Sequence, residues 1–194
     1  MMGLTGNGST ADRSALEGVP RSPKHSKHTI VALVEDRPGV LNKIASKWRQ
    51  RGYNIESLAV GHSETQGLSR MTFVVDASNT DVDQVIKQLY KIIEVAKVTD
   101  VTNVPTVHRE LCLVKVKATP TTRGQIIEVC DMFRARIVDV AADSLIIEAT
   151  GTEDKMDAIF EMLKPFGIKE VVRTGRIAMS RGASSVSLSE EGND

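Results

Sequence analysis

The sequence predicts an α+β fold of two tandem ferredoxin-like domains, each with the element order βαββαβ. The chain has 194 residues, a length that suits two small domains as well as one large domain. Strand-like and helix-like apolar patterns follow one another in the same order twice. The segments RGYNIESL, from Arg51, and RARIVDVA, from Arg134, take corresponding places in the two halves, which is typical of an internal repeat.

The first half begins with a β-branched run that Pro38 and Gly39 bring to an end. A helix pattern follows, with apolar residues on one face and Gly52 as its stop signal. Thr80 and Asp83 resemble a capping box ahead of a second amphipathic helix. The elements expected in this half are strands at 28–34, 53–61, 68–76 and 94–103 and helices at 40–48 and 82–93.

The second half repeats this order. Its first strand alternates apolar residues with Lys115 and Lys117, as a strand with one solvated face does. Thr122 and Gln125 form a capping pair ahead of the next helix, and Gly167 precedes the last strand. The elements expected here are strands at 110–118, 136–141, 144–150 and 168–179 and helices at 126–133 and 153–164.

The two chain ends carry too few apolar residues to offset the entropy lost on ordering. The sequence therefore divides into a disordered tail at 1–27, a first domain at 28–105, a second domain at 106–182 and a disordered, Ser-rich acidic tail at 183–194. The N-terminal segment has no apolar stretch behind a basic start, so no secretory signal is expected. No apolar run approaches the roughly 18 residues of a membrane span. We therefore expect a cytoplasmic protein without a membrane partner.

Charge and reactive residues restrict the possible functions. The chain has 25 Lys+Arg and 25 Asp+Glu, a net charge of +0, which argues against a nucleic-acid partner. The two cysteines lie in apolar contexts without metal or redox spacing and are expected to be buried free thiols. The histidines are scattered, and single arginines at strand ends are usually surface ion pairs, so we expect no metal site and no catalytic residue. These residues are Cys112, Cys130, His25, His28, His62, His108, Arg70 and Arg109.

The first strand has apolar residues on both of its faces, Ile30 and Ala32 on one and Val31 and Leu33 on the other. The helices of a ferredoxin-like domain cover one face of its sheet, so the second face and the sheet edges need another cover. A homodimer through the first domain is the simplest cover.

The strongest local signal for a site is the strand–loop–helix passage from Leu33 to Leu41. A helix N-terminus presents free N–H groups and the positive end of the helix dipole, and Gly39 has no side chain to block a ligand. Asp36 can accept hydrogen bonds from an ammonium group, so the loop suits a zwitterionic amino acid. The alternative is that Pro38 and Gly39 only turn the chain into the helix.

A second signal is Asn54, at the start of a β-friendly run. Asparagine is depleted in strands because its amide prefers local hydrogen bonds. Asn54 therefore either begins the strand or directs the donor and acceptor of its amide at a ligand.

The passages EDRPGVLNKIASKWRQRGYNIESLAVG and LSRMTFVV resemble an ACT domain, and closely that of the small regulatory subunit of acetolactate synthase. The resemblance continues through RELCLVKVKA, IEVCDMFRARIVDV, EATGTEDKMDAI and TGRIAMSRG and covers about residues 28–182. It implies an N-terminal ACT domain and a C-terminal ACT-like domain.

The resemblance implies a regulatory protein of branched-chain amino acid biosynthesis that activates a large catalytic subunit and confers feedback inhibition by valine. The cofactors thiamine diphosphate, Mg²⁺ and FAD would lie on that partner, with none on this chain. In the family the effector lies between two ACT domains, with the loop from one chain and the start of the second strand from its neighbour. Carried over to this sequence, the effector-binding residues are Asp36, Pro38, Gly39, Val40 and Leu41 on one chain and Asn54 and Ile55 on the other. Gly61 is a weaker candidate for the wall of this site.

The second repeat departs from the ACT pattern. Its corresponding loop, 118–124, lacks the compact Pro-Gly-Val-Leu turn, and Arg136 and Ile137 stand where the first repeat has Tyr53 and Asn54. It should not bind an amino acid in the same way, and the resemblance implies that it shares in contacting the catalytic subunit. The chain contains no thiamine-binding module, so an independent enzyme is not expected. A free-standing tandem-ACT amino-acid sensor, or a regulator of another enzyme, is the alternative function.

Overall fold

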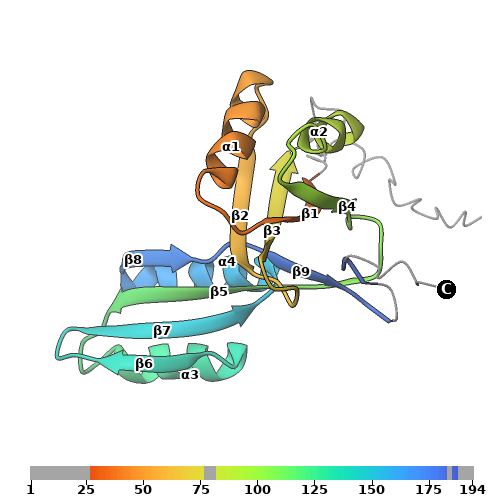
Figure 1. Ribbon diagram of the computed structural model, residues 1–194. Helices are drawn as coiled ribbons and strands as arrows, with labels where there is room; N and C mark the ends of the chain where they lie inside the picture. Colours follow the sequence, from red (N-terminus) through yellow and green to blue (C-terminus); the bar gives the residue numbers. More distant parts are fainter. Residues whose placement is uncertain (1–26, 77–81, 183–184, 188–194) are drawn as a thin grey trace, which may run out of the picture.

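A computed structural model of the chain describes residues 27–76, 82–182 and 185–187. It contains two antiparallel sheets, each with two helices on one face, and the order βαββαβ occurs twice along the chain (Figure 1). The predicted α+β fold of two tandem ferredoxin-like domains is confirmed. Its elements differ most from the predicted ones at the end of the second helix, at the start of β5 and in the C-terminal strand.

The first domain has the strand order β2-β3-β1-β4. Its core lies between this sheet and the two helices, where the tilted rings of Trp48 and Phe73 pack with their centroids 4.6 Å apart. Its elements are β1 (Lys27–Glu35), α1 (Val40–Gln50), β2 (Ile55–His62), β3 (Leu68–Asp76), α2 (Val82–Leu89) and β4 (Val95–Asp100).

The helix α2 is shorter than predicted, because the chain turns after Leu89 to enter β4. Ile92 is buried in this turn while Ile93, predicted on the apolar helix face, is 94% exposed. Thr80 of the predicted capping box lies outside the described residues.

The second domain has the strand order β6-β7-β5-β8 and a separate core. The N-cap residue of α3 is Thr122, as predicted, but its hydroxyl accepts a hydrogen bond from the Thr119 N–H and does not cap the helix. The elements are β5 (Thr106–Lys117), α3 (Arg123–Phe133), β6 (Arg136–Val140), β7 (Ser144–Gly151), α4 (Glu153–Leu163), a 3₁₀ turn (Lys164–Phe166), β8 (Ile168–Arg173) and β9 (Ile177–Ser180).

The predicted last strand, 168–179, is in fact two strands. The strand is interrupted around Gly175, which has a φ of +82°. Gly175 approaches β2 so closely that a Cβ would lie 2.6 Å from Ser57 Oγ. After this break β9 pairs with the first four residues of β5, so that β5 begins earlier than the predicted residue 110. The β5–β9 ribbon leaves the second sheet and crosses the first domain (Figure 1).

The second face of the first sheet is covered by the chain itself. Val31 packs with Val101, Ala178 of β9 and Val186 in one buried cluster. Val186 belongs to the predicted disordered tail at 183–194, yet it is 6% exposed, because its apolar side chain finds this open sheet face. Lys27, assigned to the N-terminal tail, is the first residue of β1. The predicted dimer is therefore not needed to cover this face.

Candidate functional site

The loop before α1, residues 36–41, is fixed to its neighbours through the backbone. The Glu35 N–H donates to Glu94 O at 2.8 Å, and the Asp36 N–H donates to Gly67 O at 2.8 Å. Gly39 is the N-cap residue of α1 and has a φ of +89°, a left-handed conformation that favours glycine. No atom lies within 4 Å of the position that a Cβ would take. The loop, which we call the α1 loop, is thus rigidly placed with open space over Gly39.

The N-terminus of α1 has no competing anion of its own. No side chain caps it, and its first turn contains no acidic residue. The N–H groups of a first helical turn have no intrahelical acceptor, so the positive end of this helix is available to a carboxylate. Pro38, Gly39 and Leu41 are exposed beside it, whereas the Val40 side chain is 3% exposed and belongs to the core. Val40 therefore cannot contribute its side chain, and its N–H already donates to Arg37 O at 3.4 Å. The N–H groups of Leu41 and Asn42 are the ones left for a ligand.

Asp36 lies next to a residue that the sequence analysis left out of the site. The His62 Nδ1 atom is 3.1 Å from Asp36 Oδ2, and both side chains are largely exposed. Sequence spacing gives no signal for this pair, because the β2–β3 register brings His62 opposite Ser69, beside the end of β1. Gly61 precedes His62 on the edge strand β2, so it lies at the same end of the sheet.

Asn54 and Ile55 lie at the other end of the sheet. Ile55 pairs with Val75, which pairs with His28 near the beginning of β1, whereas the α1 loop follows Glu35. Seven residues of strand correspond to about 23 Å at roughly 3.3 Å per residue. A single chain therefore does not bring the two predicted parts of the site together.

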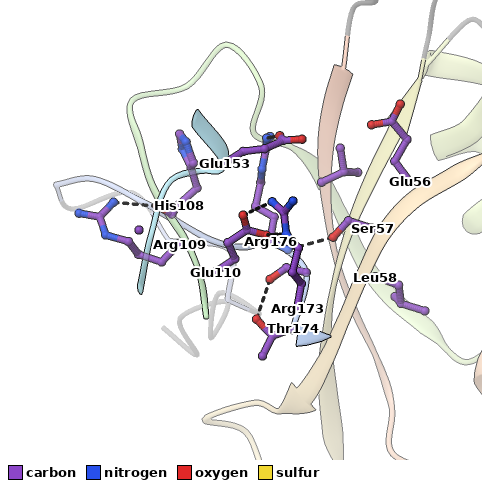
Figure 2. A pocket seen from close by; sticks show the side chains of 13 residues that line it. Glu56, Ser57, Leu58, His108, Arg109, Glu110, Glu153, Arg173, Thr174 and Arg176 are labelled. Carbon is purple, nitrogen blue, oxygen red and sulfur yellow. Dashed lines mark hydrogen bonds and ion pairs between the residues drawn. The ribbon is translucent and has the colours of Figure 1, made fainter. Parts of the chain in front are cut away.

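A cluster of charged residues joins the two domains, and Figure 2 shows it from close by. The Arg176 N–H donates to Ser57 Oγ at 2.9 Å, and its guanidinium donates to Thr29 Oγ1 at 2.9 Å and to Glu153 Oε2 at 2.7 Å. Lys27 lies 2.9 Å from Glu153 and 3.0 Å from Glu56. The Lys27 hydrogen bond is the main cause that lowers the pKa of Glu153.

The same junction contains an ion pair of Arg173 with Glu110, whose side chain is 8% exposed. Arg173 also lies 3.4 Å from Asp157 and 5.4 Å from the centre of the Phe160 ring. These Arg173 contacts lie within the second domain and line the same cavity of about 370 Å³. The contacts of Arg176 with Ser57 and Thr29 and the Lys27–Glu153 pair are the ones that join the two domains. The sequence gives no local signal for this cluster, because its members come from distant parts of the chain.

The remaining sequence-predicted residues have different environments. Cys112 and Cys130 are buried free thiols, as predicted, and burial raises the pKa of both. Arg70 and Arg109 were expected in surface ion pairs, but Arg70 donates to the carbonyls of Ala178 and Val186 and Arg109 to that of His108. The difference for Arg70 arises because the C-terminal segment folds over β3. His28, expected to be solvated or in a turn, is in β1 and 2.8 Å from Asp100.

The described part of the chain offers neither a metal site nor a membrane-spanning helix. No cluster of three His, Cys, Asp or Glu side chains there could hold a metal ion. Among the helices of residues 27–76 and 82–182, none has the length and apolar composition needed to cross a membrane.

Comparison with known proteins gives consistent results for both domains. Residues 30–97 match the model of the AHAS small subunit-like ACT domain, and residues 109–182 match that of the small subunit of acetolactate synthase. The chain is 55% identical over 156 residues to a probable acetolactate synthase small subunit of Archaeoglobus fulgidus, covering 80% of this chain and 98% of that protein. It is 48% identical over 166 residues to the acetolactate synthase small subunit of Bacillus subtilis, covering 85% of this chain and 96% of that protein.

A solved structure shows the same fold. The crystal structure of the acetolactate synthase small subunit from Thermotoga maritima superimposes with a TM-score of 0.76 at 38% sequence identity, covering 81% of this chain and 99% of that one. The fold and these relatives define a regulatory protein of the ACT-domain class. The chain belongs to the family of acetolactate synthase small subunits.

Proposed function

We propose that this chain is the non-catalytic regulatory subunit of acetolactate synthase, which activates a separate large catalytic subunit and makes it sensitive to valine. The open N-terminus of α1, with Gly39 in the left-handed conformation and Asp36 beside it, is the observation that carries the proposal. Thiamine diphosphate, Mg²⁺ and FAD would be bound by the catalytic partner.

Valine suits the α1 loop in three respects. Its carboxylate would accept hydrogen bonds from the free N–H groups of the first turn of α1. Its ammonium group would donate to Asp36, whose carboxylate is exposed and now contacts His62. Its branched side chain would lie against Leu41, which is 43% exposed.

The edge strand β2 supports a homodimer that completes this site. It pairs with β3 on one side and is the outermost strand of the first sheet. An antiparallel pairing of two β2 strands places the Asn54 end of one strand against the His62 end of the other. Because His62 lies beside Asp36, this pairing would bring Asn54 and Ile55 of one chain to the α1 loop of its partner. Of the two reasons for a dimer that the sequence offers, the open edge of the sheet is the one that supports this proposal.

The experiment that tests the function is co-expression of the full chain with the large acetolactate synthase subunit from the same organism. We expect the two to co-purify, acetolactate formation to rise when this chain is added, and valine to inhibit only the complex. The chain purified without the large subunit should form no acetolactate. A free-standing sensor would bind valine yet neither co-purify with the large subunit nor change its rate.

A further inference from the structure

A second cavity lies where the β5–β9 ribbon crosses the first sheet, on the face opposite to α1 and α2. It encloses about 330 Å³, within the range of sites that hold small molecules. Small residues of β2 and β3 and apolar residues of the ribbon line it. Among them are Ala59, Gly61, Thr72, Val107, Ile177 and Met179. We call this cavity the ribbon groove.

Two arginines line the ribbon groove without a carboxylate partner. Arg70 is half-buried and donates to two neutral acceptors, Ala178 O at 2.9 Å and Val186 O at 3.2 Å. Arg109 is exposed and donates to His108 O at 2.7 Å. In the described part of the chain neither forms an ion pair, and no acidic residue lines the groove.

The charged neighbours of these arginines leave the positive charge largely uncompensated. Glu64, in the β2–β3 turn, acts on Arg70 at longer range, while burial lowers the pKa of Arg70. His62 also lines the groove, and its Nδ1 contacts Asp36 on the α1 loop. A guanidinium has five N–H donors, and two carbonyls do not use all of those on Arg70. A ligand anion could therefore be bound without breaking the contacts to the C-terminal segment.

We propose that the ribbon groove binds a small aliphatic carboxylate that has no amino group, such as a branched 2-oxo acid. The carboxylate would contact Arg70 and Arg109, and the aliphatic part would lie against Ile177 and Met179. A zwitterionic amino acid is disfavoured here, because no carboxylate lines the groove to receive its ammonium group. This separates the ribbon groove from the α1 loop, where Asp36 provides that carboxylate. The inference goes beyond the proposed function, since it assigns a second site and a second ligand class.

Such a ligand would contact both domains at once. Arg70 and Thr72 belong to β3 of the first domain, whereas Ile177 and Met179 belong to β9. Binding should therefore stabilise the packing of the ribbon against the first sheet, since a ligand that binds the folded state raises its stability.

The test is titration calorimetry of the full chain with 3-methyl-2-oxobutanoate, which has the carbon skeleton of valine with an oxo group in place of the ammonium. We expect the 2-oxo acid to bind. Saturating valine should change the affinity for the 2-oxo acid by no more than about twofold. Met179→Glu introduces a carboxylate that competes for the arginines and should weaken binding at least about tenfold. Met179→Gln has nearly the same shape without the charge, so it loses an apolar contact only and should weaken binding clearly less than Met179→Glu does. Met179 is 68% exposed, so both variants should fold, which circular dichroism checks.

Three results would overturn the inference. The first is no measurable binding at about millimolar 2-oxo acid. The second is that valine displaces the 2-oxo acid while Met179→Glu leaves its affinity unchanged. The 2-oxo acid would then occupy the α1 loop and not the ribbon groove. The third is absent binding combined with loss of partner activation in Met179→Glu, which would make the groove a docking surface for the catalytic subunit. Failure of valine to bind, with the 2-oxo acid still bound, would contradict the proposed function alone.

Discussion

At the scale of single residues, Gly39 combines a backbone requirement with open space. Its φ of +89° is costly for most side chains, yet nothing lies near the position of a Cβ. Asn and Asp tolerate this left-handed conformation better than other non-glycine residues. A substitution there should therefore act on the ligand more than on the fold.

We predict that Gly39→Asp sharply weakens valine binding. The new carboxylate adds bulk and places a negative charge at the helix N-terminus, where the valine carboxylate should lie. Gly39→Asn is the matched control, with the same shape and no charge, and should bind valine better than the Asp variant. Calorimetry of both variants measures the difference. Wild-type affinity in Gly39→Asp would show that the site is placed wrongly.

Asn54 gives the second prediction. Replacing it with Ala removes a polar partner of a largely desolvated ligand group, which typically costs about 1 to 3 kcal/mol, or roughly 5- to 150-fold in affinity. Asn54 is exposed, so thermal unfolding of the variant should match that of wild type. Feedback inhibition should weaken while activation of the partner survives. Equal loss of activation and valine sensitivity would contradict a separate docking role for the second domain.

At the scale of elements, β2 is the strand on which the proposed two-chain site depends. We predict that the chain is at least a dimer at micromolar concentration in analytical ultracentrifugation with valine present. In a dimer that mixes Gly39→Asp with Asn54→Ala chains, one site carries both changes and the other carries neither. Mixing the two variants should therefore restore tight valine binding to about half of the sites in each mixed dimer.

The outcome of this mixing experiment separates two arrangements. If each site were built within one chain, every site of the mixed dimer would keep one defect and mixing would restore nothing. A monomer in the ultracentrifuge would contradict the pairing of β2 strands altogether.

The elements also show what could be predicted from the sequence. The repeated order, α1 and the α1 loop follow from local periodicity and turn chemistry, which act within a few residues. The break at Gly175 could not be predicted in this way, because it follows from contact with Ser57 in another domain. The same holds for the Asp36–His62 pair, which depends on sheet register. Local patterns thus predict elements, while contacts between distant segments complete the site.

At the scale of the whole molecule, the ion cluster around Glu153 links the domains and should make their packing depend on pH. The hydrogen bond from Lys27, with the charge of Arg176, lowers the pKa of Glu153 below its usual 4.5. The ionised form is therefore favoured by folding, and its contribution is complete above about pH 4.5 and lost as the pH falls through the lowered pKa.

We predict that Glu153→Gln reduces stability at neutral pH and makes it depend less on pH below 4.5 than in wild type. Urea unfolding at a series of pH values measures both effects. Glu161→Gln is the control, since Glu161 forms an exposed pair within its own helix region. An unchanged pH dependence in Glu153→Gln would show that this cluster does not couple folding to protonation.

The return of the C-terminal segment to the first sheet has a consequence for synthesis on the ribosome. Arg70 and Val186 are 116 residues apart in sequence but hydrogen-bonded in the fold. The first domain emerges from the exit tunnel long before Ala178 and Val186, so its sheet has an uncovered apolar face during most of translation. The nascent chain is exposed to aggregation and to chaperones through this face until Ala178 and Val186 are made. Premature stop codons that remove Ala178 and Val186 should therefore leave this apolar face uncovered in the finished chain.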